Sequence, residues 1–80
     1  MTNNDKNYQG WANYETWNVA LWIQNDAGLY NLAKGYRYHG FRSFAEMLRE
    51  DLDFRETPDQ VALNDSGLDI DELDEMLREL

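Results

Sequence analysis

The stretch Asn13-Tyr-Glu-Thr-Trp-Asn-Val-Ala-Leu-Trp-Ile23 decides the fold of this chain. It opens on an asparagine, a favoured helix N-cap, and Glu15 follows in the first turn, where the helix dipole favours a carboxylate. At 100° per residue the apolar side chains spread around most of the helix, which is typical of a helix enclosed by the core. The stretch therefore predicts a buried central helix over residues 14–24.

A second, short helix is predicted directly after the first. Asp26 is a suitable N-cap for a helix over residues 27–34, and Gly35 is a natural residue to follow its end. Two glycines then interrupt the chain, and aromatic residues alternate with polar ones. Residues 36–42 are therefore expected to form a loop or a short extended segment.

Two further helix starts are predicted from capping signals. Ser43-Phe-Ala-Glu46 has the pattern of a capping box and predicts a helix over residues 44–54. Thr57-Pro58 places a proline at the first helical position and predicts a short helical segment through Leu63.

The last helix is predicted over residues 70–79, with Asp69 as its N-cap and an apolar stripe at spacings of three and four residues. The expected fold class is therefore all-α: a small compact bundle of three main helices plus two short helical segments. Its predicted core contains Trp17, Leu21, Trp22, Leu48, Leu73 and Leu77.

Length and composition predict one domain. Eighty residues leave room for a single thin core, and an aromatic content of 14% argues for a packed one. Residues 1–10 are polar and are expected to be a disordered lead-in to a helical domain over residues 11–80. The chain has no cysteine, no signal-peptide pattern and no long apolar run, so a cytoplasmic location is expected.

Charge is concentrated in the C-terminal part of the chain. Residues 1–49 contain four acids and five bases, a net charge of +1, whereas residues 50–80 contain twelve acids and two bases, a net charge of −10. We call residues 50–80 the acidic lobe. The total charge of −9 opposes binding to nucleic acid, so direct binding to it is not expected.

The sequence contains no recognisable catalytic or metal-binding motif. One histidine, no cysteine and no Gly-x-Ser-x-Gly motif exclude the usual nucleophile–histidine signatures. His39 lies in the interrupted segment and is expected to be a surface or hydrogen-bonded residue. Runs starting at Asp51 and Asp65 lack the glycine and glutamate of an EF-hand calcium loop. We therefore expect a protein that is not an enzyme and that has no cofactor.

The last predicted helix has more acids than its own stability requires. Like charges at Asp71, Glu75 and Glu79 are spaced four residues apart, and each neighbouring pair costs about 0.2–0.5 kcal/mol. Solubility alone could explain them. The alternative is a surface that occupies a basic groove on another protein, as an inhibitor that mimics a phosphate backbone does. The candidate partner-binding residues are Asp71, Glu72, Asp74, Glu75 and Glu79.

A basic and aromatic segment supports a competing hypothesis. Tyr36, Arg37, Tyr38 and Arg42 have the composition of a site that stacks unpaired bases and follows phosphates. The simpler interpretation is that the aromatic rings pack under the loop while the arginines pair with the acidic lobe. The total charge favours the simpler interpretation.

Asn13-Tyr-Glu-Thr-Trp17, continued through Gly28-Leu-Tyr30, resembles a group of short uncharacterised proteins of bacteria, plasmids and bacteriophages. A later Thr-Pro-Asp segment, here Thr57-Pro58-Asp59, is similar as well, whereas Gln60 departs from the pattern, in which a glycine is expected. The resemblance covers about a third of the chain and implies no activity. It implies a context in which small proteins often bind and block a host protein.

These observations rank three functions. The first is a non-enzymatic acidic protein-binding module, of the kind that inhibits or modulates a host protein with a basic surface or groove. The second is a nucleic-acid-binding module that uses residues 34–42. The third is a structural or assembly component, for example a homodimer formed through Trp11 or Tyr8.

Overall fold

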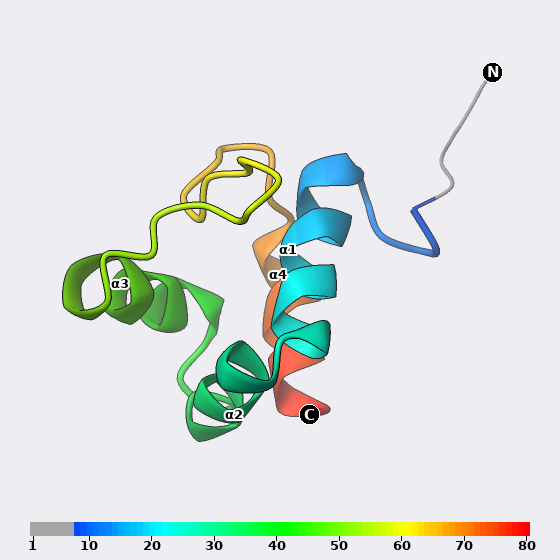
Figure 1. The fold of residues 1–80 in the computed structure, drawn as a ribbon. Helices are drawn as coiled ribbons and strands as arrows, with labels where there is room; N and C mark the ends of the chain where they lie inside the picture. The colour runs from blue at the N-terminus through cyan, green and yellow to red at the C-terminus, as the bar shows by residue number, and fades with distance from the viewer. Residues whose placement is uncertain (1–7) are drawn as a thin grey trace, which may run out of the picture.

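The computed structural model describes residues 8–80, which form four helices joined by turns (Figure 1). They are α1 (Tyr14–Asn25), α2 (Ala27–Gly35), α3 (Phe41–Asp51) and α4 (Ile70–Arg78). Figure 1 shows α1 and α4 side by side with the same direction, α2 across their lower ends and α3 to one side. The all-α prediction is confirmed, because residues 8–80 contain no strand, only an isolated bridge between Glu56 and Ala62. The predicted number of helices, three main and two short, is not matched.

Three helices begin where their capping residues predicted. Each cap oxygen accepts a hydrogen bond from the amide three residues further on, which satisfies one of the free donors of the first turn. The bonds are Thr16 N–H to Asn13 at 2.9 Å, Leu29 N–H to Asp26 at 2.9 Å and Glu72 N–H to Asp69 at 3.1 Å.

Helix α3 begins at Phe41 and ends at Asp51, so its predicted range of 44–54 and its capping box were wrong. Ser43 lies inside the helix, and the N-cap is Gly40, whose φ of 91° favours glycine. The amide of Phe41 instead donates to Asp74 on α4 over 2.6 Å. Because Phe41 is almost fully buried, its position in the core determines where the helix starts.

The chain before α3 is a loop, as predicted, except that Phe41 and Arg42 belong to α3. Gly35 is the last residue of α2, and Tyr36 follows as the C-cap. Residues 36–39 form a turn closed by the His39 amide, which donates to the Tyr36 carbonyl over 2.9 Å. They are neither extended nor strand-like.

The short helix predicted after Pro58 is absent. Thr57–Gln60 form a tight turn in which the Gln60 amide donates to the Thr57 carbonyl over 2.7 Å, and Gln60 has a φ of 72°. A left-handed residue directly after a turn is the geometry of a hairpin with a bulge, and it ends any helix. The Glu56–Ala62 bridge closes this hairpin.

The core lies between the four helices and is closed by apolar residues of the loop before α4. Leu48, Leu73 and Leu77 are buried as predicted, but Trp17, Leu21 and Trp22 are only partly buried. Helix α4 contacts each of the other three helices. An 80-residue chain has too few residues to cover α1 on every side. The buried apolar residues are Val19, Ala20, Ile23, Leu29, Ala33, Phe41, Phe44, Ala45, Leu48, Val61, Leu63, Leu68, Leu73, Met76 and Leu77.

The predicted lead-in of residues 1–10 falls partly outside the described residues, which begin at Tyr8. Residues 8–10 form a turn, and the Trp11 amide donates to the Tyr8 carbonyl over 2.9 Å. The Tyr8 ring packs against Tyr14 and Trp17, with both pairs of ring centroids 6.0 Å apart. The turn is thereby attached to the outer face of α1.

Candidate partner-binding surface

The five acidic candidates on α4 divide into two groups. The inner face of the helix contributes Leu73, Met76 and Leu77 to the core, which leaves the carboxylates on its flanks and outer face. Two carboxylates accept hydrogen bonds from main-chain amides of other segments. The other three are exposed. The sequence pattern did not distinguish these groups, because their hydrogen-bond partners are distant in the chain.

Asp74 and Glu72 each connect α4 to another segment of the chain through a hydrogen bond. Asp74 caps α3 through the Phe41 amide, and Glu72 accepts from the Ala12 amide over 2.9 Å. Both side chains are partly buried. Arg78 follows Asp74 by one helical turn, but within residues 8–80 the one ion pair shorter than 4 Å joins Arg55 to Asp53. Asp74 therefore has a structural partner instead.

Asp71, Glu75 and Glu79 form what we call the acidic row. All three are exposed, and among the described residues none of them lies within 4 Å of a basic group. Residues four apart on a helix rise by about 6 Å, so the row places a negative charge at each turn. A continuous line of charge without a counter-charge is available to an external cation.

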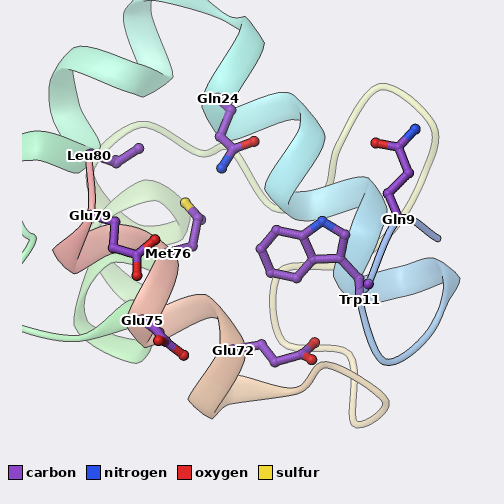
Figure 2. A pocket seen from close by; sticks show the side chains of 9 residues that line it. Gln9, Trp11, Gln24, Glu72, Glu75, Met76, Glu79 and Leu80 are labelled. Atoms are coloured by element: carbon purple, nitrogen blue, oxygen red, sulfur yellow. The ribbon is translucent and has the colours of Figure 1, made fainter.

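A groove runs between the N-terminal turn, α1 and α4. Figure 2 shows the Trp11 indole on one side and Glu72, Glu75 and Glu79 along α4 on the other, with Gln24 and Met76 between them. The groove encloses about 410 Å³. We call it the Trp11 groove. Its lining consists of Gln9, Gly10, Trp11, Gln24, Glu72, Glu75, Met76, Glu79 and Leu80.

Sequence reasoning missed this groove. Trp11 was singled out only as an exposed contact for a dimer, whereas it is half-buried and packs against the core. The signal available was the i, i+3, i+7 spacing of Glu72, Glu75 and Glu79, which places them on one side of α4. Nothing local to residues 9–11 showed that they lie over this helix.

The residues of the competing nucleic-acid hypothesis do not gather into one surface. Tyr36 is partly buried and packs on Phe44, with ring centroids 5.6 Å apart, and Arg37 donates to the main-chain oxygen of Leu80 over 3.1 Å. Tyr38 is 80% exposed, and Arg42 is exposed on α3. The expectation that the rings pack under the loop is correct for Tyr36 and wrong for Tyr38. Arg37 contacts main chain rather than an acidic side chain.

The surroundings of His39 agree with the expectation of a surface or hydrogen-bonded residue. It is exposed, and its ring lies edge-on to Tyr36 with centroids 5.6 Å apart. Across residues 8–80, no three side chains of the metal-binding types His, Cys, Asp and Glu converge on a point where they could hold an ion.

A polar network that the sequence did not predict attaches the hairpin to α1. Buried Thr57 donates to Asn18 Oδ1 over 2.7 Å, while Asn18 Nδ2 and the Trp22 indole N–H donate to Asp59 over 2.8 and 3.0 Å. The hydrogen bonds from Asn18 and Trp22 hold the pKa of the Asp59 carboxyl below its ordinary value of 3.8. Asp59 is therefore a structural acid.

Residues 4–80 match the model of a family described as a family of unknown function (DUF7249). The chain belongs to this family. No curated protein and no solved structure matches the sequence. Membership of the DUF7249 family therefore describes nearly the whole chain without assigning an activity to it. Residues 8–80 of this DUF7249 protein contain no helix with the length and apolar character needed to cross a membrane.

Proposed function

We propose that this DUF7249 protein is a non-enzymatic binding module that places the acidic row of α4 against a basic groove on a partner protein. The observation that carries the proposal is the exposure of Asp71, Glu75 and Glu79 without a basic group within 4 Å. Neighbouring like charges cost helix stability, and their presence beyond the cap residue of α4 supports a role in binding an external partner.

The fold supports the proposal because it leaves these three acids unused. Asp74 and Glu72 are held by the amides of Phe41 and Ala12, so they contribute negative potential but not freely moving side chains. A helix with one charge at each turn presents a regular line of negative charge, as a nucleic-acid strand does, with a spacing of about 6 Å against roughly 3.4 Å for the strand. The partner class is therefore a host protein with a basic groove, including one that normally holds nucleic acid, and the effect is inhibition or modulation.

The experiment compares two variants that remove the same charge from different places. The first carries Asp71→Asn, Glu75→Gln and Glu79→Gln, and the control carries Glu50→Gln, Asp51→Asn and Glu56→Gln. The partner is isolated from lysate at low salt, and its binding kinetics are measured over a range of salt concentrations.

We expect the α4 variant to associate more slowly and with a flatter salt dependence, because it lacks the three charges that attract the basic partner over a distance. The control should keep most of the wild-type association rate. Equal effects in both variants would show that only total charge matters, and full binding by the α4 variant would leave the acidic row with a role in solubility.

A second candidate function rests on Tyr38, whose 80% exposure contradicts simple packing under the loop. An exposed tyrosine with the Arg37 guanidinium 6.0 Å from its ring centre could stack on an unpaired base. We expect no submicromolar binding at physiological salt, because the chain carries a net charge of −9. Fluorescence anisotropy with single-stranded and duplex oligonucleotides tests this. Tight binding that Arg37→Ala or Arg42→Ala weakens would make this function the leading one.

A further inference from the structure

The Trp11 groove carries an unbalanced charge. Glu72, Glu75 and Glu79 line it from α4, and its lining includes no lysine, arginine or histidine. The single hydrogen bond to these carboxylates within residues 8–80 comes from the Ala12 amide to Glu72. Three negative charges on one side of a groove repel one another, and a cation placed among them would relieve that repulsion.

The groove also has an apolar and aromatic wall. The half-buried Trp11 indole faces the α4 carboxylates across the groove, and the largely buried Met76 side chain also lines it (Figure 2). The face of an indole attracts cations, and a thioether provides a surface for an alkyl chain. The complementary ligand is therefore a cationic head on a short apolar stem.

Arginine fits this description better than lysine does. Its planar guanidinium can stack on the indole while its five N–H donors reach several acceptors at once. Those acceptors are the three carboxylates together with the amide oxygen of Gln24. The volume of about 410 Å³ lies within the range of sites that hold small ligands.

We propose that the Trp11 groove receives one arginine side chain of the partner protein, with the guanidinium held between the Trp11 indole and the carboxylates of Glu75 and Glu79. This inference rests on the proposed function and identifies an arginine side chain as the group that anchors the partner. An arginine buried beside an aromatic ring is a common source of a few dominant contacts in an interface. The acidic row then aligns the partner, and the groove fixes its register.

The other dense group of acids in the lobe shows why charge alone is not sufficient. Glu50, Asp51, Asp53 and Glu56 are exposed around the C-terminal end of α3, and none of them lines the Trp11 groove or the groove between α3 and the loop before α4. A basic side chain would meet charge there without either groove to receive its stem.

The test uses a small probe that needs no partner. Butylguanidinium is titrated into the ¹⁵N-labelled full chain, and butylurea, which has the same shape without the charge, is the control ligand. The readouts are the indole N–H of Trp11 and the amides of Glu75 and Glu79. We expect saturable shifts with a Kd of about 1–10 mM for butylguanidinium and at least fivefold weaker binding of butylurea.

Variants locate the site. Glu75→Gln and Trp11→Leu should each raise the Kd of butylguanidinium by at least threefold. Asp71→Asn removes a charge from the acidic row but not from the groove, so it should leave this Kd within twofold of the wild-type value. Glu75→Gln keeps the test valid if Trp11→Leu unfolds the protein. Equal binding of the two ligands, or shifts at Asp71 and Glu50 as large as those at Glu75, would overturn the inference.

The probe result and the partner result are separable. If the probe does not bind while the α4 variant still slows the partner, the arginine anchor fails and the proposed function stands. If the probe binds the groove but the α4 variant binds the partner as the wild type does, the groove is a cation site that the partner does not use, and both the arginine anchor and the proposed function fail.

Discussion

The hairpin at Thr57–Val61 and helix α4 both carry carboxylates at the surface, but they use them differently. In the hairpin, Asp59 accepts two hydrogen bonds from α1 and fixes the loop. On α4, two acids are fixed in the same way, and Asp71, Glu75 and Glu79 are not. The comparison shows that acidic composition does not identify a binding surface. A carboxylate can bind a partner only if the fold does not already engage it with a donor.

The largest expected effect is a loss of stability when the buried hydrogen bonds that attach the hairpin to α1 are removed. Thr57→Val removes the hydroxyl that donates to buried Asn18 and accepts from the Val61 amide. Two buried polar groups then lack a hydrogen-bond partner, and each costs about 1–3 kcal/mol of folding free energy. We expect the free energy of unfolding, measured by urea denaturation, to fall by about 2–4 kcal/mol. Thr57→Ser keeps the hydroxyl and should lose less than half of that.

The next effect tests whether Asp74 is structural. Asp74→Ala leaves the Phe41 amide without its acceptor, and the loss of a helix cap costs about 0.5–2 kcal/mol. Asp71→Ala, on the exposed side of the same helix, should change stability by no more than about 0.5 kcal/mol. Urea denaturation of both variants compares them directly. Equal losses would show that the division of the α4 acids is wrong.

A stabilising change is expected at the tip of the hairpin. Gln60 has a φ of 72°, a conformation that costs a residue with a side chain about 1–2 kcal/mol and costs glycine little. Gln60→Gly should therefore raise the free energy of unfolding by about 0.5–1 kcal/mol after the greater freedom of the unfolded chain is subtracted. Gln24→Gly, the same substitution inside α1, should lower it by about 1 kcal/mol. Thermal melts of the two variants should shift in opposite directions.

Removal of the acidic row should leave the fold intact. The Asp71→Asn, Glu75→Gln and Glu79→Gln variant loses two like-charge pairs, each worth about 0.2–0.5 kcal/mol, and also loses one favourable first-turn acid. We expect a stability within about 0.5 kcal/mol of the wild type in low salt. A loss above 1 kcal/mol would mean that these acids, like Asp59, have a structural role.

The smallest effect concerns acid pH. The folded-state pKa of Asp59 is lower than its unfolded value, so its contribution to stability is present above the unfolded pKa and is lost as pH falls through the folded one. The stability difference between wild type and Asp59→Asn should therefore be constant from pH 7 to about 5 and shrink below about 4. Urea denaturation from pH 7 to 2.5 measures it. A difference that does not change with pH would exclude an ionic contribution.

The sequence predicted those parts of the fold that depend on neighbours in the chain. Asn13, Asp26 and Asp69 cap amides three residues away, so their helices could be placed from local pattern. The start of α3 depends on Asp74, and the hairpin depends on Asn18, so both were misplaced. A local capping box at Ser43 was outweighed by the burial of Phe41.

The candidate site was predictable to a similar extent. The spacing of Asp71, Glu75 and Glu79 placed them on one face of a helix, and this could be seen without a structure. The structural roles of Glu72 and Asp74 could not be predicted, because their donors lie 60 and 33 residues away. The expected burial of Trp17 and Trp22 failed because apolar pattern does not show how much chain is available to cover a helix.

The hydrogen bonds at the start of α1 have a consequence for how the chain folds. The Asn13 amide group donates to the Gly67 carbonyl, and the Asp69 amide donates to the Thr16 hydroxyl. These bonds close loops of more than 50 residues, whose entropy must be lost before the contacts can form. During synthesis α1 can form early, but its N-terminal end has no partner until Gly67 and Asp69 have left the ribosome. The native fold is therefore reached only after the segment through α4 has been made, and a chain stopped before residue 67 keeps α1 without the helix that packs beside it.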